Sequence, residues 1–451
     1  MKIMKVNLKQ SVLFFAICFL SLPVYAQTKQ WTLEECISYA IEHNITVKRM
    51  EIQKNVAEVD VNTAQMSRLP DLNASAGQNW SFGRTQIKTG LYENINQANS
   101  SASIGSSVPI FTGFRIPNEI ARNKLALQAA MENLAKAKED LSLNIATLFL
   151  QVMFNKELVK ISESQMQLSE SQVQRTEILV DAGKVPSSQL YDIKAQVAND
   201  KVSVIQAEND LNLALLDLKQ SLELEKETEF DIVVPDMSNI VDKTMSSVQP
   251  VNVVFDNAVQ IKPVVKAQEY MVAGAEKTLK IAQSGYLPTL SLNFGLGTGY
   301  YYMYGKDFTN TSFSEQFKNN RQEYIGLNLS IPIFNRFSVR NQVRNARFNI
   351  TDQQLALENV KKNLFKEIQT AYLNAVSSQA KYTASQDAVA STSEAFRLAQ
   401  ERYEVGKSSV FEFNEARTKL LQSRLQQAQS KYDYIFRAKI LDYYNGIPIK
   451  L

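Results

Sequence analysis

The tetrapeptide Val-Pro-Ile-Phe at residues 108–111 returns as Ile-Pro-Ile-Phe at residues 331–334, which lie 223 positions later. The same offset carries the Gly-Lys pair at 183–184 onto a second Gly-Lys pair at 406–407, with no gap in between. A constant offset over so long a segment is typical of an internal repeat. The chain is therefore expected to contain two copies of one structural unit.

A third landmark helps to place the two copies along the chain. Leu-Pro-Asp-Leu at 69–72 matches Leu-Pro-Thr-Leu at 287–290, with a slightly shorter offset. Because the landmarks keep one order in both halves, chance is a poor explanation for them. We predict a first repeat over 27–230 and a second repeat over 251–451, joined by a linker or equatorial segment at 231–250.

Long stretches without glycine or proline predict helices far beyond the globular norm. Neither residue type occurs from 118 to 182 or from 333 to 405. Within the first stretch, Leu141, Ile145 and Leu148 step by four and three residues, which is the seam of packed helices. At about 1.5 Å per residue, such helices are rods of roughly 100 Å.

Each rod is expected to turn back at a glycine. Gly183 and Gly406 follow the two stretches, and glycine readily takes the positive φ found just past helix C-termini. A second helix follows each turn, so each repeat should contain a long antiparallel helix hairpin. The predicted helices cover residues 32–69, 118–182, 187–229, 252–286, 336–405 and 408–445.

Short alternating segments precede each rod and predict four strands. Leu290, Leu292 and Phe294 alternate with small polar residues, so one face is apolar and the other is suited to water. Such strands of about ten residues are typical of a transmembrane barrel, although a soluble antiparallel sheet shows the same alternation. Aromatic residues gather near one end, as in an interfacial girdle: Trp80, Phe82, Tyr300, Tyr301, Tyr302 and Tyr304. The predicted strands cover residues 71–83, 101–111, 289–303 and 324–334.

The segment 1–26 resembles a secretory signal peptide. A basic start is followed by an apolar run from Val12 to Leu20, which is too short to span a bilayer, and by small residues suited to cleavage before Gln27. An uncleaved anchor is the alternative interpretation. The export signal favours the membrane interpretation of the strands.

The composition excludes several functional classes. Lys and Arg number 49 against 46 Asp and Glu, and the small excess comes from three lysines in the leader. A neutral mature chain argues against a nucleic-acid partner, because phosphate binding needs a basic surface. The single His43 rules out a multi-histidine metal site, and the sequence has no phosphate-binding loop, nucleophile elbow or dinucleotide fingerprint. We therefore expect no catalytic residues, no metal and no cofactor.

Four strands cannot close a barrel on their own. An open strand edge in lipid would leave backbone groups unpaired at several kcal/mol each, so closure needs several chains. Two chains would give eight strands with a filled interior, whereas three would give twelve strands around an aqueous lumen. Small residues on the polar face favour the open lumen: Ser75, Gly77, Ser291 and Gly295.

With these landmarks in place, the chain resembles the outer-membrane efflux protein (TolC) family. The resemblance rests on the opening Trp-Thr-Leu-Glu-Glu-Cys at 31–36, the two Leu-Pro strand starts, the two Pro-Ile-Phe strand ends and both Gly tips. It covers essentially all of the mature sequence. It implies a mainly α fold with a small β part, in which a homotrimer forms a twelve-stranded transmembrane β-barrel continued by a periplasmic α-helical barrel.

The resemblance also implies a function. Such a protein is the passive exit duct of a tripartite efflux or type I secretion system in the outer membrane of a Gram-negative bacterium. Its expected partners are outer-membrane lipid, a periplasmic adaptor (membrane fusion) protein and an inner-membrane pump of the RND or ABC type. Export of small molecules and export of proteins both remain open, as does the resting state of the pore.

Two groups of residues take roles from the resemblance. The hairpin tips are expected to contact the adaptor: Gly183, Lys184, Val185, Val405, Gly406, Lys407, Ser408 and Ser409. Tyr403, Glu412 and Glu415 occupy positions that the family uses for its periplasmic aperture and gate. The i, i+3 spacing puts both carboxylates on one helix face, and threefold symmetry would turn them into acidic rings that favour cations. An ordinary solvated helix face is the alternative interpretation of this pair.

One rival class remains after enzymes are set aside. A soluble periplasmic coiled-coil adaptor or scaffold would also carry long heptad-like helices and an export signal. Cell fractionation distinguishes the two, because only the channel requires a detergent-extracted trimer from the outer membrane.

Overall fold

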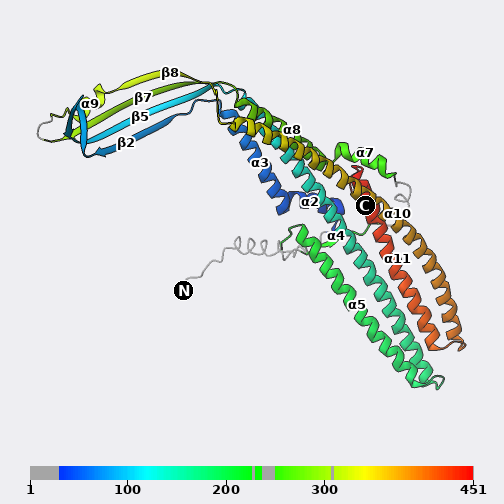
Figure 1. Ribbon diagram of the computed structural model, residues 1–451. Helices are drawn as coiled ribbons and strands as arrows, with labels where there is room; N and C mark the ends of the chain where they lie inside the picture. Colours follow the sequence, from blue (N-terminus) through cyan, green and yellow to red (C-terminus); the bar gives the residue numbers. More distant parts are fainter. Residues whose placement is uncertain (1–29, 226–228, 236–248, 306–308, 450–451) are drawn as a thin grey trace, which may run out of the picture.

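The computed structural model is an elongated molecule, with a β-sheet at one end and the turns of two long helix hairpins at the other (Figure 1). The expected signal peptide at 1–26 and most of the expected linker at 231–250 lie outside the described residues. The structure describes residues 30–225, 229–235, 249–305 and 309–449. Within them, no helix combines the length and the apolar character that crossing a membrane requires.

A four-stranded antiparallel sheet brings the two repeats together, in the order β2-β5-β7-β8. Its strands are β2 (Asn73–Ser81), β5 (Asn96–Phe111), β7 (Thr289–Tyr304) and β8 (Gln322–Ser330). The central pair, β5 and β7, comes from different repeats and is joined along the full length of both strands. Sheet formation therefore requires both copies of the duplicated unit.

The register of this sheet aligns the alternation of all its strands. Gly105 lies opposite both Asn73 and Gly295, so small and polar residues share one face. Its neighbour Ile104 lies opposite Ala74 and Leu296 on the other face. The sheet thus has one small, polar face and one apolar face, which is the two-sided pattern that the sequence predicts.

The strands depart furthest from their expected bounds at two ends, and by one or two residues elsewhere. β5 begins at Asn96 instead of residue 101, because Asn96 and its neighbours pair with the far end of β7. β8 ends at Ser330 instead of residue 334, and Pro332 lacks the N–H that a longer ladder would need. The segments between the paired strands of each repeat contain a small hairpin, β3 (Arg84–Lys88) with β4 (Leu91–Asn94), and a short helix, α9 (Phe313–Asn319).

Two helix hairpins of equal dimensions make up the rest of the rod. The long helices α4 (Arg115–Asp181) and α10 (Ser338–Glu404) have 67 residues each. Their return partners, α5 (Ser187–Ser221) and α11 (Val410–Tyr444), have 35 residues each. Since neither long helix contains a glycine, and the only proline, Pro117, stands in the first turn of α4, they run without interruption for roughly 100 Å.

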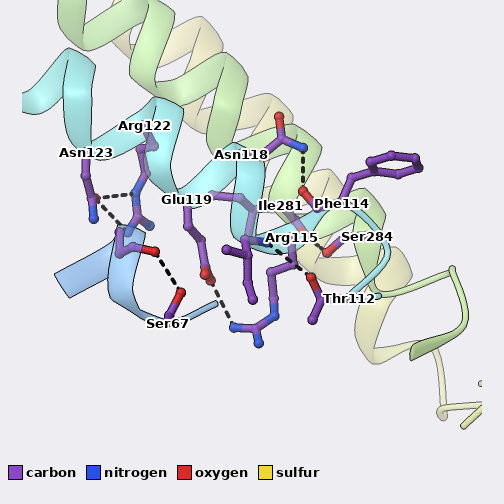
Figure 2. A network of polar contacts seen from close by, with 12 residues as sticks. Ser67, Thr112, Phe114, Arg115, Asn118, Glu119, Arg122, Asn123, Ile281 and Ser284 are labelled. Atoms are coloured by element: carbon purple, nitrogen blue, oxygen red, sulfur yellow. Dashed lines mark hydrogen bonds and ion pairs between the residues drawn. The ribbon is translucent and has the colours of Figure 1, made fainter. Parts of the chain in front are cut away.

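Each strand leads into its long helix through two consecutive residues of left-handed backbone. Gly113 and Phe114 have φ of 59° and 66°, and Arg336 and Phe337 at the same place in the second repeat have φ of 54° and 60°. A Cβ on Gly113 would lie 2.8 Å from the carbonyl oxygen of Ser284, so the first repeat needs glycine there. Figure 2 shows this corner in the first repeat, where the Asn118 amide donates to the Phe114 carbonyl at 2.8 Å.

Two of the expected helices are each divided in two. The helix expected over 32–69 consists of α2 (Leu33–His43) and α3 (Ile45–Met66), and the break at Asn44 arises because its side chain caps α3 by accepting from the Thr46 N–H at 2.9 Å. The helix expected over 252–286 consists of α7 (Val251–Ile261) and α8 (Pro263–Ser284). Lys262 is extended there because the following proline disfavours helical backbone before it.

The helix expected over 187–229 ends early, at Ser221. Glu223 takes a left-handed φ of 58°, and the Leu224 N–H closes the end by donating to the Lys219 carbonyl at 3.2 Å. Leu222, in between, is fully buried in the main core. No glycine marks this C-terminus, so the sequence carries no signal for it.

The main core lies halfway along the rod, where both repeats meet. Large side chains from α4 and α11 fill it, including Phe149, Met153 and Tyr434. A short parallel pair, β1 (Gln30–Trp31) with β6 (Asp231–Ile232), closes one side. A smaller core packs α7 against α10 and α11.

Candidate functional site

The turn of the first hairpin is a Schellman motif. Gly183 has φ of 69°, its N–H donates to the Val180 carbonyl at 2.8 Å, and the Lys184 N–H donates to the Leu179 carbonyl at 2.9 Å. Pro186 then precedes the first residue of α5 and offers no side-chain cap. Lys184 is exposed and Val185 is half-buried at the extreme end of the rod.

The turn of the second hairpin has the same backbone. Gly406 has φ of 72°, its N–H donates to the Tyr403 carbonyl at 3.0 Å, and the Lys407 N–H donates to the Arg402 carbonyl at 2.8 Å. A Cβ on either turn glycine would meet no atom, so the left-handed backbone alone selects glycine there. Val405 is 67% exposed, which makes it an apolar side chain presented to solvent beside the turn.

Tyr403 is held in place by a small aromatic cluster. Its ring stacks on Phe413 with centroids 4.9 Å apart, and Phe396 also packs against Phe413, at 5.5 Å. Phe413 itself is buried between α10 and α11. The tyrosine ring is thereby fixed against the hairpin instead of extending freely from it.

Glu412 has a local role that the sequence interpretation overlooked. It forms a capping box with Ser409: the Glu412 N–H donates to the Ser409 hydroxyl, and the Ser409 N–H donates to the Glu412 carboxylate, each at 3.2 Å. The Ser408 hydroxyl adds a bond of 2.5 Å to the same carboxylate oxygen. The bond from Ser408, followed by that from the Ser409 backbone, holds the pKa of Glu412 below its usual value. The spacing Ser-x-x-Glu at 409–412 was a readable signal for this cap.

Glu415 directs its carboxylate to a different partner along the same helix. Lys419, one turn further on, donates to it at 2.7 Å in an exposed ion pair. The structure therefore keeps Glu412 and Glu415 within one turn of α11, but it does not bring the two carboxylates onto a shared partner in one chain. Both side chains remain exposed.

A buried polar network joins the two hairpins above the tips. Arg417 on α11 is 3% exposed and donates to the Ser169 hydroxyl on α4 at 2.7 Å, and that hydroxyl donates to Asp200 on α5. The Arg417 guanidinium lies 4.0 Å from the Asp200 carboxylate, which also accepts from Gln196 at 2.8 Å. Burial lowers the pKa of Arg417, and the charge of Asp200 opposes that change.

This network was not predicted from the sequence. Its one local signal is that Arg417 occupies the seam position between the buried Phe413 and Leu420, where an apolar residue is expected. Its partners are too distant along the chain to be inferred from spacing. Nearer the tips, Arg175 on α4 forms a second link by pairing with Glu404 on α10 at 2.9 Å.

The described residues offer no metal-binding group of three or more His, Cys, Asp or Glu side chains. The tip region instead combines exposed turns, an aromatic anchor and carboxylates that face solvent. Such an arrangement can contact another protein and can influence ions near it.

Comparison with known proteins places these features in context. The family model described as outer membrane efflux protein matches residues 36–223 and 254–441. The chain is 22% identical over 397 residues to the outer membrane protein TolC of Escherichia coli K12, covering 85% of this chain and 77% of that protein. It is 19% identical to the proteases secretion protein PrtF of Dickeya chrysanthemi, covering 88% and 84% of the two chains.

Solved structures have the same fold. The structure of CusC superimposes with a TM-score of 0.77 at 18% identity, covering 94% of this chain and 96% of that one. The open state of the Neisseria gonorrhoeae MtrE outer membrane channel superimposes with a TM-score of 0.73 at 15% identity, covering 93% and 90%.

Proposed function

Since this chain belongs to the outer membrane efflux protein family, we propose that it is the outer-membrane exit duct of a tripartite efflux or type I secretion system. Its family and structural neighbours are channel proteins, not enzymes. The sheet lies in the outer membrane and the helix hairpins extend through the periplasm. The observation that carries the proposal is the single four-stranded sheet with one apolar face, built jointly by two repeats.

The two outer strands of this sheet support closure by three copies. β2 and β8 each have nine residues and each pairs on one side only within the described chain. The strand order makes β2 of one copy antiparallel to β8 of the next. Three copies then close twelve strands into a barrel with the polar face inside, and no backbone group is left unpaired in lipid.

Exposed apolar residues along the helices support the same assembly. Ile52, Val56 and Val59 follow one another at helical spacing on α3, and all are more than half exposed. Val202 and Ile205 do the same on α5. Monomeric soluble proteins rarely present such stripes. Contact with neighbouring copies would bury them and continue the barrel as a helical tunnel.

The organisation of the chain follows from this role. We infer that the two repeats, residues 27–230 and 251–451, form two equivalent parts of the tunnel wall. Residues 231–250 would form part of a belt around the rod. A cleaved leader at 1–26 would direct the chain to the periplasm.

The hairpin tips are proposed as the docking surface for a periplasmic adaptor protein. Gly183, Lys184 and Val185 form one tip, and the other is formed by Val405, Gly406, Lys407, Ser408 and Ser409. The exposed Val405 beside a lysine offers an apolar contact with a charge next to it. An inner-membrane pump of the RND or ABC type supplies the energy, and the duct itself is passive.

Tyr403, Glu412 and Glu415 are proposed to line the periplasmic aperture. In three copies, the exposed carboxylates would form rings that attract cations and repel anions. Glu412 would do so while also capping α11, so its carboxylate is held at a fixed position. Tyr403 would set the width of the aperture from its place against Phe413.

The channel is tested with protein extracted from outer membranes in detergent. We expect a trimer by mass that conducts ions in planar bilayers. Glu412→Gln together with Glu415→Gln should keep the trimer but reduce cation selectivity, whereas Glu394→Gln on α10 should not. A water-soluble monomer without conductance would overturn the channel and would favour a periplasmic coiled-coil scaffold.

A further inference from the structure

A basic stripe follows the strand-to-helix corner of the second repeat. Three exposed arginines, Arg340, Arg344 and Arg347, share one side of the first turns of α10, and the exposed Arg336 comes two residues before the helix. The three helical arginines span about 10 Å along the helix axis. The buried Val339, Val343 and Ala346 each come directly before one of these arginines, so the neighbouring side of the helix, about 100° away, packs inward. The arginines therefore form one continuous solvent-facing surface, called here the arginine stripe.

Among the described residues, no carboxylate forms an ion pair with any of these four arginines. The chain has no Asp or Glu from 324 to 351. The ion pairs that α10 does make involve residues further along it: Lys361, Lys362, Arg397 and Glu404. Four uncompensated guanidinium groups so close together repel one another unless an anionic partner lies against them.

The first repeat lacks the stripe at the corresponding positions. The offset between the two Pro-Ile-Phe motifs maps the four arginines onto Gly113, Pro117, Ala121 and Lys124. The two arginines that the first turns of α4 do carry, Arg115 and Arg122, are engaged locally, by Glu119 at 3.1 Å and by Asn123 at 3.2 Å (Figure 2). Arg336 also keeps a left-handed φ of 54°, a backbone conformation that is strained for any residue with a side chain. The fold alone does not call for arginine here.

Apolar and aromatic side chains lie directly above the stripe. Ile331 and Ile333 continue the apolar face of β8 toward the corner, and Ile333 is 94% exposed. Phe334 then packs edge to face with Phe337 at 5.6 Å, and the Arg340 guanidinium lies 5.4 Å from the Phe337 ring centre. Both rings are exposed. The apolar strand, the aromatic pair and the arginines thus follow one another along the chain. This order matches the hydrocarbon core, the interface and the headgroup layer of a bilayer.

The direction of the helix strengthens this order. α10 runs away from the sheet, and side chains on a helix tilt toward its N-terminus. The long arginine side chains therefore lean back toward the sheet, and their alkyl stems can lie along the aromatic rings. Clusters of four or more basic residues next to a membrane segment are typical of anionic lipid binding.

We propose that the arginine stripe binds the phosphate groups of anionic phospholipids in the periplasmic leaflet of the outer membrane. The inference rests on the proposed membrane location of the sheet. In the trimer it gives three lipid-binding patches, one at each second repeat, with non-binding first repeats between them. These patches would fix the height and tilt of the duct relative to the bilayer.

Lipid retention by the purified trimer tests this proposal. Native mass spectrometry would count phosphatidylglycerol molecules bound to the trimer in detergent, with phosphatidylcholine as the neutral comparison. We expect wild type to prefer phosphatidylglycerol, with binding that weakens as salt is raised. Arg340→Gln/Arg344→Gln/Arg347→Gln should bind it roughly tenfold more weakly or worse, and the three Arg→Lys changes should retain binding.

A matched control lies on the same helix. Lys362→Gln/Lys366→Gln/Lys381→Gln removes the same charge further from the sheet and should leave phosphatidylglycerol binding unchanged. Equal binding by the arginine variant and wild type would overturn the proposal. Dissociation of the arginine variant into monomers would overturn it too, because the stripe would then belong to a contact between copies. Conductance of the wild-type trimer in planar bilayers tests the channel itself separately.

Discussion

The two hairpins have one backbone and two chemistries. α4 and α10 have the same length, as do α5 and α11, and both turns use a glycine in the same Schellman motif. At the first turn, however, α5 begins after Pro186 without a side-chain cap, whereas α11 begins with a capping box that uses a carboxylate. The two repeats thus share helix lengths and turn glycines, which the backbone geometry requires. They differ in the side chains at the start of the return helix, which that geometry does not fix.

The breaks between helices, called joints here, also share a position in the two repeats and differ in their side chains. Asn44 and Lys262 occupy equivalent breaks in the two repeats, between the two helices that precede each sheet segment. Asn44 caps its own helix and donates to the Ser221 carbonyl at 3.2 Å. Lys262 instead reaches across to Glu139 at 3.1 Å and lies 3.5 Å from the ring centre of Tyr443. Of the two joints, it is therefore the second that makes a charged contact with the other repeat.

The largest expected effect comes from breaking the link between the hairpins. Asp200→Ala leaves the buried Arg417 without its carboxylate, and loss of one partner of a buried pair costs about 3 to 5 kcal/mol. The midpoint of thermal unfolding of the detergent-solubilised trimer should fall accordingly. Asp387→Ala, at an exposed position on α10, should change it little. Equal, small effects would mean that the network does not hold the hairpins together.

The two joints should respond unequally to substitution. Lys262→Ala removes a buried ammonium with its ion pair and its contact with Tyr443, and we expect a loss of about 2 kcal/mol. Asn44→Ala removes a helix cap, for which about 1 kcal/mol is typical. Denaturant unfolding of the two variants would measure the difference. A larger effect at Asn44 would contradict the asymmetry between the repeats.

The uncapped and capped tips offer a smaller contrast. Ser409→Ala removes the hydroxyl that accepts from the Glu412 N–H and should weaken the first turn of α11 by about 1 kcal/mol. Hydrogen exchange of that turn should rise about fivefold. Ser187→Ala at the start of α5, a helix without a side-chain cap, is the matched variant and should leave exchange unchanged. A similar rise at both tips would show that capping does not distinguish them.

The smallest expected effect is a dependence on pH at the second tip alone. The pKa of Glu412 is lowered in the folded chain. Its carboxylate therefore contributes fully to the cap above the ordinary carboxyl pKa of about 4.3, and this contribution is lost as pH falls through the lower pKa of the folded chain. The protection of amides in the first turn of α11, measured relative to the intrinsic exchange rate at each pH, should therefore fall below about pH 4. The first turn of α5 has no acidic residue and should show no such step. Glu412→Gln should abolish the step, and its persistence would assign it to another group.

Much of the fold could be predicted because its signals are local. The absence of glycine from both rods, their almost complete lack of proline and the position of Gly183 and Gly406 define the hairpins. The alternation around Leu290 defines the sheet faces, which the register then aligns. The break at Asn44 was also local in part, since asparagine is a strong helix cap, but its bond to Ser221 joins distant parts of the chain.

The site was less predictable because its contacts are not local. The turns at Gly183 and Gly406 were predicted from the sequence, and the role of Tyr403 at an aperture stays a prediction. The capping role of Glu412 could have been inferred from Ser409, three residues earlier. Arg417 could not be interpreted in this way, because Ser169 lies in the other repeat and only the packing of α4 against α11 brings them together. Spacing along the chain therefore predicts turns and caps, and it does not predict which helices share a buried charge.

The equal lengths of the two hairpins restrict how this protein can change in evolution. Two extra turns added to α4 alone would lower one tip by about 10 Å relative to the other. In a trimer of such chains, the tips would then end at two alternating heights, and an adaptor would no longer meet them all in one plane. Any lengthening of the rod must therefore occur in α4, α5, α10 and α11 together. Insertions should accordingly be tolerated in the loops between the strands and selected against in these four helices.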